Sequence, residues 1–276
     1  MDPRFHRAAE AAADAYGAAG ASAVLLAGSG SRDVADRFSD LDLYVVWDEL
    51  PDEAVRAEAI ARAGGAMQRL YPYDRAERLL FDEWTLDNVP FEVAHVSAAD
   101  AELAIADVVE RHDPDPGKLL YVSAFATGSA LAGSDLIARL RDTALPYPDR
   151  LATAVIRAHA QIDFLWQLQA HLERGNPLLG YAWVADTHRR LLHALLAANR
   201  VYFFGFKRLE AVEARLPLAP QDLARRIRDT YGAASAELGA SVGSLAEETY
   251  DIVEQTVPDV DVDRLRRLLR YRRTLD

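Results

Sequence analysis

The stretch Ala23–Val46, AVLLAGSGSRDVADRFSDLDLYVV, decides the fold of the first half of the chain. A short apolar run ends in the turn Gly28-Ser29, and after ten intervening residues the triplet Asp40-Leu41-Asp42 opens a second apolar run. This order predicts a strand, a loop and a second strand, Leu41–Trp47. Because alternate side chains of a strand lie on one face, Asp40 and Asp42 are expected to point the same way, while the leucines beside them point into the core.

The two carboxylates and the turn together predict a site for a divalent metal and for phosphate. Two adjacent carboxylates repel each other unless a cation lies between them, and Mg²⁺ prefers such hard oxygen ligands. The turn Gly28-Ser29 offers backbone N–H groups and a hydroxyl that can hold phosphate oxygens, and Arg32 can add positive charge. The alternative interpretation is a strand that begins with two solvated acids, near a surface arginine.

The same residues carry a resemblance to a known family. Gly28-Ser29 followed, after ten residues, by Asp40-x-Asp42 resembles the signature of the nucleotidyltransferase superfamily that includes DNA polymerase beta. Members of similar size and layout include the kanamycin and lincosamide nucleotidyltransferases, which modify antibiotics. The family places a third carboxylate in an apolar-acid-apolar triplet on a neighbouring strand. Phe91-Glu92-Val93 matches that triplet, although the family residue is often Asp and Glu92 is one methylene longer.

This resemblance implies an activity and a role for each site residue. Asp40 and Asp42 would bind two Mg²⁺ ions and Glu92 one of them, while Gly28 and Ser29 hold the terminal phosphates of ATP or another nucleoside triphosphate. A hydroxyl of a small molecule would attack the α-phosphorus, and pyrophosphate would leave. An aminoglycoside-like or other antibiotic is one candidate for that acceptor. For the second half of the chain, the resemblance extends only to the helical layout.

The reaction also needs a group that receives or orients the acceptor proton. A helix is predicted over 149–174, and Asp163 lies in its apolar segment Gln161–Trp166. Burial there would raise the pKa of the Asp163 carboxyl and fit it for general-base catalysis. The alternatives are that Asp163 is a surface acid paired with an arginine, and that Glu92 acts as the base.

Composition limits the class of protein and its partners. The chain has 276 residues, no cysteine and a net charge of −12, so disulfides and thiolate metal sites are excluded. The negative charge lies almost entirely before Leu145, which disfavours long nucleic acid as a partner and favours metal ions or a cationic substrate, or simply makes the surface soluble. No signal-peptide pattern or long apolar run is present, which predicts a soluble cytoplasmic protein. The protein is expected to be a monomer or a homodimer.

The expected fold is of the α+β class, with a mixed-sheet nucleotidyltransferase domain over 1–145 and an all-α helical-bundle domain over 149–276 that binds substrate. The segment Leu145–Asp149, with two prolines, is the predicted linker. Helical or strand spacing predicts the following elements in the first domain: helices 3–20, 52–70, 98–111 and 118–127, and a hairpin of Leu79–Trp84 with Val89–Val96 around Asp87-Asn88. In the second domain it predicts helices 149–174, 178–199, 206–215, 220–238, 243–255 and 261–272.

A different functional class also fits this sequence. A catalytically weak nucleotidyltransferase fold can act as a binding or antitoxin-like module, although minimal antitoxins of the superfamily usually lack so long a helical tail. The histidines add no metal site to either reading. His95 is expected on the strand face opposite Glu92, and the five-residue spacing of His188 and His193 does not suit a shared metal on one helix face.

Overall fold

The structure is a computed structural model that describes residues 3–28 and 39–272. The chain divides into two compact units, one made of Met1–Arg111 with Gly117–Pro146 and the other of His112–Pro116 with Tyr147–Asp276. The division after Pro146 falls inside the proline-containing segment that follows the last helix of the first unit. Over the described ranges, no helix combines the length and apolar character that crossing a membrane requires.

The first unit is built on a six-stranded mixed sheet with the strand order β3-β4-β5-β2-β1-β6. β2 and β5 are parallel, and the other neighbouring pairs are antiparallel. The α+β fold class predicted from the sequence is therefore confirmed, with strands at the following positions: β1 Ala23–Leu26, β2 Leu41–Trp47, β3 Ala66–Leu70, β4 Leu80–Leu86, β5 Val89–Ser97 and β6 Ser129–Ala132.

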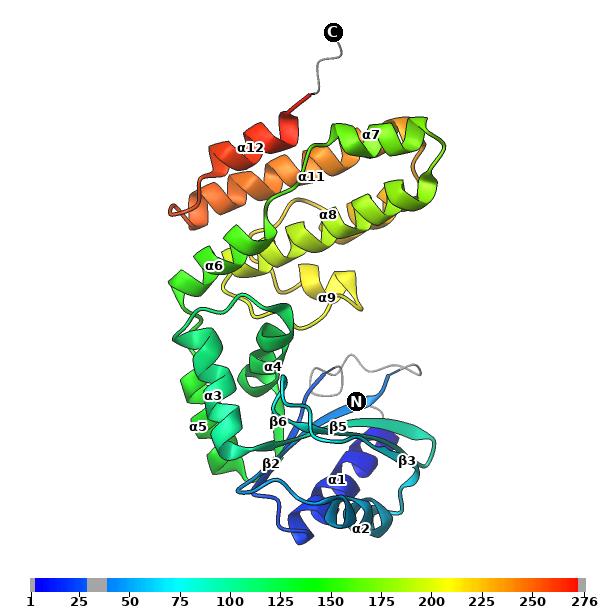
Figure 1. Ribbon diagram of the computed structural model, residues 1–276, viewed down its shortest axis with the longest axis vertical. Helices are drawn as coiled ribbons and strands as arrows, with labels where there is room; N and C mark the ends of the chain where they lie inside the picture. Colours follow the sequence, from blue (N-terminus) through cyan, green and yellow to red (C-terminus); the bar gives the residue numbers. More distant parts are fainter. Residues whose placement is uncertain (1–2, 29–38, 273–276) are drawn as a thin grey trace. The chain divides into compact units, whose positions relative to one another are not determined.

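Helices cover both faces of this sheet. α1 (Pro3–Ala18) and α2 (Glu53–Ala63) pack against the face that carries Leu43 and Val93, and they enclose a hydrophobic core with that face (Figure 1). The opposite face carries Tyr44, whose ring contacts Tyr121 and Phe125 at centroid distances of 5.2 and 5.5 Å. Those two aromatic residues belong to α4 (Pro116–Thr127). The remaining helices of this unit are α3 (Ala98–Val109) and α5 (Ser134–Ala144).

The predicted helix over 52–70 is wrong in its last part. α2 ends at Ala63 because Gly64 adopts a left-handed conformation with φ of 82°. The Gly64 N–H donates hydrogen bonds to the carbonyl oxygens of Ile60 and Ala61. Residues 66–70 then form β3, which pairs with β4. The predicted hairpin is confirmed, since Asp87 and Asn88 have φ values of 50° and 62°, as a two-residue turn between β4 and β5 requires.

A buried polar network joins α2 to the central strands on the α1 side of the sheet. The Asp82 carboxylate accepts a hydrogen bond from Arg56 Nη1 and lies 2.9 Å from His95 Nε2. Trp47 Nε1 donates to His95 Nδ1 over 3.1 Å. Because an indole N–H can only donate, the ring proton of His95 is on Nε2, which donates to Asp82. Burial lowers the pKa of His95, so the ring is neutral, in the core and on the face predicted for it.

Replacing Asp82 by alanine is expected to lower the free energy of unfolding of the first unit by roughly 3–5 kcal/mol. Asp82 is fully buried and Arg56 is only 3% exposed, so the substitution leaves a buried guanidinium without its counter-charge. Urea denaturation checks the value, with Glu58→Ala as the control, because Glu58 forms an exposed ion pair with Arg62 that contributes little. Equal stabilities of the two variants would contradict this account.

The described residues of the second unit form helices and the segments that connect them, and none of them belongs to a strand. α8 and α11 lie side by side along most of their length, and α7 packs on both through Leu168, Val184 and Leu238 (Figure 1). The helices have the following bounds: α6 Asp149–His159, α7 Trp166–Glu173, α8 Pro177–Ala198, α9 Leu209–Glu213, α10 Leu223–Gly232, α11 Ser235–Thr256 and α12 Val262–Arg270.

The single helix predicted over 149–174 is wrong, because the chain leaves the helix at residues 160–165. Hydrogen bonds to residues of distant helices replace the helical hydrogen bonds that the backbone loses there. Tyr250 donates its hydroxyl to the Ala160 carbonyl over 2.9 Å, and the Leu165 N–H reaches the Leu269 carbonyl at 3.4 Å. Phe164, with φ of 28°, lies in the middle of this break. Tertiary hydrogen bonds therefore replace the helical ones over this segment.

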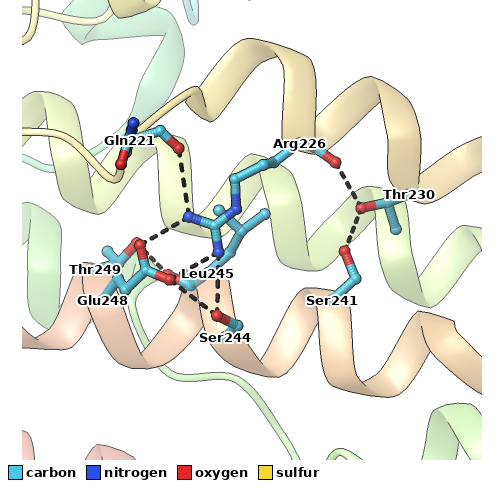
Figure 2. A network of polar contacts seen from close by, with 8 residues as sticks. All are labelled: Gln221, Arg226, Thr230, Ser241, Ser244, Leu245, Glu248 and Thr249. Atoms are coloured by element: carbon cyan, nitrogen blue, oxygen red, sulfur yellow. Dashed lines mark hydrogen bonds and ion pairs between the residues drawn. The ribbon is translucent and has the colours of Figure 1, made fainter.

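A polar network holds α10 against α11 (Figure 2). Arg226 donates from both terminal nitrogens to the two carboxylate oxygens of Glu248, each over 2.7 Å, and Ser244 donates to the same carboxylate over 2.9 Å. One turn further along, the Thr230 hydroxyl bonds to the Arg226 carbonyl and to Ser241. The bidentate geometry fixes both the distance and the orientation of the two helices.

The second unit is expected to lose stability in mild acid because two histidines of α8 are buried in neutral form. Burial lowers the pKa of His188 to about 4 and that of His193 to about 3, well below the unfolded value near 6.5. The stability linked to each neutral ring is complete above about pH 6.5 and is lost as the pH falls toward the folded pKa. For His188 the loss amounts to roughly 3 kcal/mol.

Urea denaturation at neutral and mildly acidic pH measures this loss. His188→Phe is the matched variant, because it keeps a ring beside Tyr231, which His188 contacts edge-on at 5.7 Å, and removes the titrating group. The variant should depend less on pH than the wild type in the range where His188 becomes protonated. The same slope in both proteins would show that His188 is not buried as a neutral ring.

Candidate metal and phosphate site

Three carboxylates converge at one end of β2. Asp40, Asp42 and Glu92 each offer a carboxylate oxygen, and these atoms lie within 4.8 Å of one another. Asp42 and Glu92 are direct Cα partners in the parallel pair of β2 and β5, and Asp40 lies two residues before Asp42, on the same face. Asp40 and Asp42 are half-buried and Glu92 is exposed. Because its carboxylate oxygen lies within 4.8 Å of those of Asp40 and Asp42, the longer side chain of Glu92 reaches the aspartate pair.

The chemistry of this triad suits a hard divalent cation. Three carboxylates at this spacing repel one another, and a cation among them removes the repulsion. Carboxylate oxygens are the ligands that Mg²⁺ and Ca²⁺ prefer, whereas copper, nickel and zinc sites usually include imidazole or thiolate. The donor set, three oxygens with one exposed member, leaves coordination positions for water or phosphate oxygens.

Gly28, the first residue of the turn that the sequence predicts to bind phosphate, lies directly against Asp42 of this triad. The Ala27 N–H donates to the Asp42 carbonyl over 2.9 Å, so β1 and β2 stay paired up to the turn. Gly28 has φ of 59°, and a Cβ atom at this position would lie 1.6 Å from Asp42 Oδ2. Only glycine lets the backbone approach the carboxylate so closely. Ser29 and Arg32, predicted as phosphate-binding residues, lie outside the described residues.

Tyr44 lines the same face, two residues after Asp42. Its ring packs edge-on against Tyr121 at a centroid distance of 5.2 Å. Burial raises the pKa of Tyr44, and the nearby carboxylates of Asp42 and Glu77 raise it further, so the phenol stays protonated at every physiological pH. This residue was not predicted from the sequence, where it reads as part of an apolar strand. The neutral Tyr44 ring therefore lies beside the carboxylate triad, on the side of the sheet that α4 covers.

Asp163 has a different environment from the one predicted. It lies in the break between α6 and α7 rather than on a helix, and its side chain is exposed rather than in apolar surroundings. Its carboxylate accepts a hydrogen bond from Gln161 Nε2 over 2.9 Å. Asp163 belongs to the second unit and the triad to the first. A role for Asp163 as general base remains a prediction.

Two aromatic residues on neighbouring parts of the sheet, Trp84 and Tyr71, differ in burial. Trp84 is buried and stacks on Phe91 at 4.0 Å, so it belongs to the core between the sheet and α1. Tyr71, just after β3, is half-buried and receives a hydrogen bond from Arg69 at its hydroxyl. Tyr71 is therefore partly accessible at the surface of the first unit, whereas Trp84 is not.

Comparisons with known proteins add little to this picture. No family model matches the chain, and no curated protein sequence matches it significantly. Among solved structures, a nucleotidyltransferase-like protein from Exiguobacterium sibiricum aligns with 86% of this chain and 69% of its own, at 10% sequence identity and a TM-score of 0.40. A likeness this distant does not carry an activity.

Proposed function

We propose that this chain is a metal-dependent nucleotidyltransferase, which transfers a nucleoside monophosphate from ATP or another nucleoside triphosphate to a hydroxyl group and releases pyrophosphate. One observation carries the proposal: the Asp40, Asp42 and Glu92 carboxylates lie together against a glycine turn that has no room for a side chain. Carboxylate ligands for metal ions beside a glycine turn are an arrangement that suits the binding of a triphosphate.

The chain's own residues have distinct tasks in this reaction. Asp40 and Asp42 would each hold two Mg²⁺ ions, and Glu92 would hold one of them, which would neutralise phosphate charge and align the reacting groups. Gly28, with Ser29 and Arg32, would hold the terminal phosphates. The acceptor oxygen bonds to the α-phosphorus, the bond from that phosphorus to the pyrophosphate oxygen breaks, and the hydroxyl proton passes to a carboxylate or to solvent.

The acceptor is assigned from the charge of the first half of the chain and from the helical unit. The net negative charge of the first half favours a cationic acceptor, such as an aminoglycoside-like molecule or another antibiotic. The helical unit is proposed to contribute to acceptor binding, with Asp163 as one candidate base. Glu92 is the other candidate, because its exposed carboxylate lies at the site itself.

Two measurements separate an enzyme from a binding module. A thermal shift with Mg²⁺ and each of ATP, GTP, CTP and UTP tests the nucleotide site, and an increase in Tm only when both metal and nucleotide are present is expected. Pyrophosphate release in the presence of a small-molecule cell extract then tests turnover. Binding of the Mg²⁺–nucleotide without release would favour the binding or antitoxin-like module. An unchanged Tm under every condition would contradict both.

A further inference from the structure

A row of polar side chains continues from the carboxylate triad to the edge of the sheet. Glu83 of β4 is the Cα partner of Glu92, and Arg69 of β3 is the Cα partner of Glu83. Directly paired residues share a face of the sheet, so both lie on the face that carries Glu92 and Asp42. The Cβ atoms of such antiparallel pairs are roughly 5 Å apart. The Glu83 carboxylate is therefore the next functional group beside the proposed metal ligands.

Contacts among four side chains make this part of the face an organised surface, here called the edge platform: Arg69, Tyr71, Phe81 and Glu83. Arg69 Nη1 lies 3.3 Å from Glu83 Oε2 and donates to the Tyr71 hydroxyl over 3.0 Å. The rings of Tyr71 and Phe81 are 5.8 Å apart. Arg69 is 69% exposed and Glu83 42%, and both rings are half-buried. The platform therefore offers donors, acceptors and the accessible parts of two rings to a ligand, and the Arg69 guanidinium lies over the Tyr71 ring at 6.0 Å from its centroid.

The strand order places the edge platform on the side of the triad away from the phosphate turn. In the sheet, β4 and β3 lie beyond Glu92, whereas Gly28 follows β1 on the other side of β2. A displacement at phosphorus requires the attacking oxygen and the leaving pyrophosphate to be roughly in line, on opposite sides of the phosphorus atom. With the terminal phosphates at Gly28, the attacking group comes from the β4 side.

We propose that the edge platform binds the acceptor, and that the acceptor is a polyhydroxylated, sugar-like molecule; this inference rests on the proposed function. A carboxylate accepts hydrogen bonds from ring hydroxyls and a guanidinium donates to them, which together complement neighbouring hydroxyls on one ring. The faces of Tyr71 and Phe81 suit the apolar side of such a ring. Glu83 and Arg69 are positioning residues that hold the attacking hydroxyl beside Glu92.

The test compares Glu83→Gln and Arg69→Gln with Glu58→Gln. Glu58 is a matched control, since it forms an exposed pair with Arg62 at the same 3.3 Å separation on α2. Wild type and variants are incubated with Mg²⁺ and the four nucleoside triphosphates, against glucose, glucosamine, myo-inositol and a small-molecule cell extract. Mass spectrometry identifies nucleotidylated products, and KM and kcat are then measured for the identified acceptor.

Loss of a charged hydrogen-bond partner should raise the acceptor KM of both platform variants roughly ten- to a hundredfold. The thermal shift caused by Mg²⁺ and nucleotide should stay unchanged, and Glu58→Gln should match the wild type. An edge strand also carries charge to prevent pairing with other strands, and that role alone predicts no change in KM.

Three results would overturn the inference. Platform variants with the KM of the Glu58→Gln control would show that the platform does not touch the acceptor. A weaker thermal shift with Mg²⁺–nucleotide would assign the platform to the nucleotide instead. A product whose acceptor lacks a polyhydroxylated ring would contradict the substrate class. If the wild type neither binds Mg²⁺–nucleotide nor forms any product, the proposed function itself fails, which these separate readouts distinguish from failure of the platform.

Discussion

Asp42→Asn is expected to lower the rate of pyrophosphate release by at least about a thousandfold. The substitution keeps the shape of the side chain and removes the charge at the centre of the triad, between Asp40 and the paired Glu92. An amide oxygen is a far weaker ligand for a divalent cation than a carboxylate. Pyrophosphate release with Mg²⁺ and the preferred nucleoside triphosphate measures the effect.

The fold should survive this change unharmed. Asp42 is half-buried and its carboxylate shares the site with two others, so loss of one charge relieves repulsion in the metal-free protein. The variant should therefore be as stable as the wild type, or slightly more stable, without Mg²⁺, and it should no longer gain stability from Mg²⁺ and nucleotide. The Tm with and without ligands checks both statements.

Asp48→Asn is the control for this experiment. Asp48 follows the same strand at its other end, is exposed and accepts a hydrogen bond from Ser22 Oγ over 2.8 Å. Its substitution should leave turnover unchanged. Retained turnover in Asp42→Asn, or an equal loss in both variants, would remove the catalytic interpretation of the triad.

The local part of the site could be predicted from the sequence because it depends on short-range rules. Alternation along a strand places Asp40 and Asp42 on one face, and the Gly28-Ser29 turn must precede them. The position of Glu92 depends instead on which strand lies beside β2 and in which register, and short-range patterns do not contain that information. Only the family resemblance indicated it. The strand pairing continues from Asp42 through Glu92 to Glu83 and Arg69, so these two residues are identified as neighbours of the triad only once the register is known.

The elements that were missed depend on contacts between distant parts of the chain. β6 has only four residues, SALA, without an apolar run, and it exists as a strand because it pairs with β1. The break between α6 and α7 is stabilised by Tyr250, about ninety positions away in the sequence. α2 was predicted to be too long because alanine and arginine favour helix on both sides of Gly64-Gly65. In the first two cases tertiary contacts override local preference, whereas the end of α2 follows from a local signal, the left-handed conformation of Gly64.

Gly28→Ala is expected to reduce turnover at least about a hundredfold, because the added side chain would need the space that the Asp42 carboxylate occupies. The added Cβ atom would lie 1.6 Å from Asp42 Oδ2, so either the carboxylate or the turn must move. The φ of 59° adds backbone strain of roughly 1 kcal/mol for any residue with a side chain. Pyrophosphate release and urea denaturation measure the two effects.

Gly17→Ala separates this effect from the general cost of replacing glycine. Gly17 lies in α1 with no atom within 4 Å of an added Cβ, so alanine there should stabilise the protein by roughly 0.5–1 kcal/mol and leave turnover unchanged. The double variant Gly28→Ala, Asp42→Asn decides how Gly28 acts. If its only task is to make room for the Asp42 carboxylate beside the phosphates, the double variant is no slower than Asp42→Asn alone, since the two changes then remove one interaction. Multiplying losses would mean that the glycine turn contributes to catalysis independently of the triad.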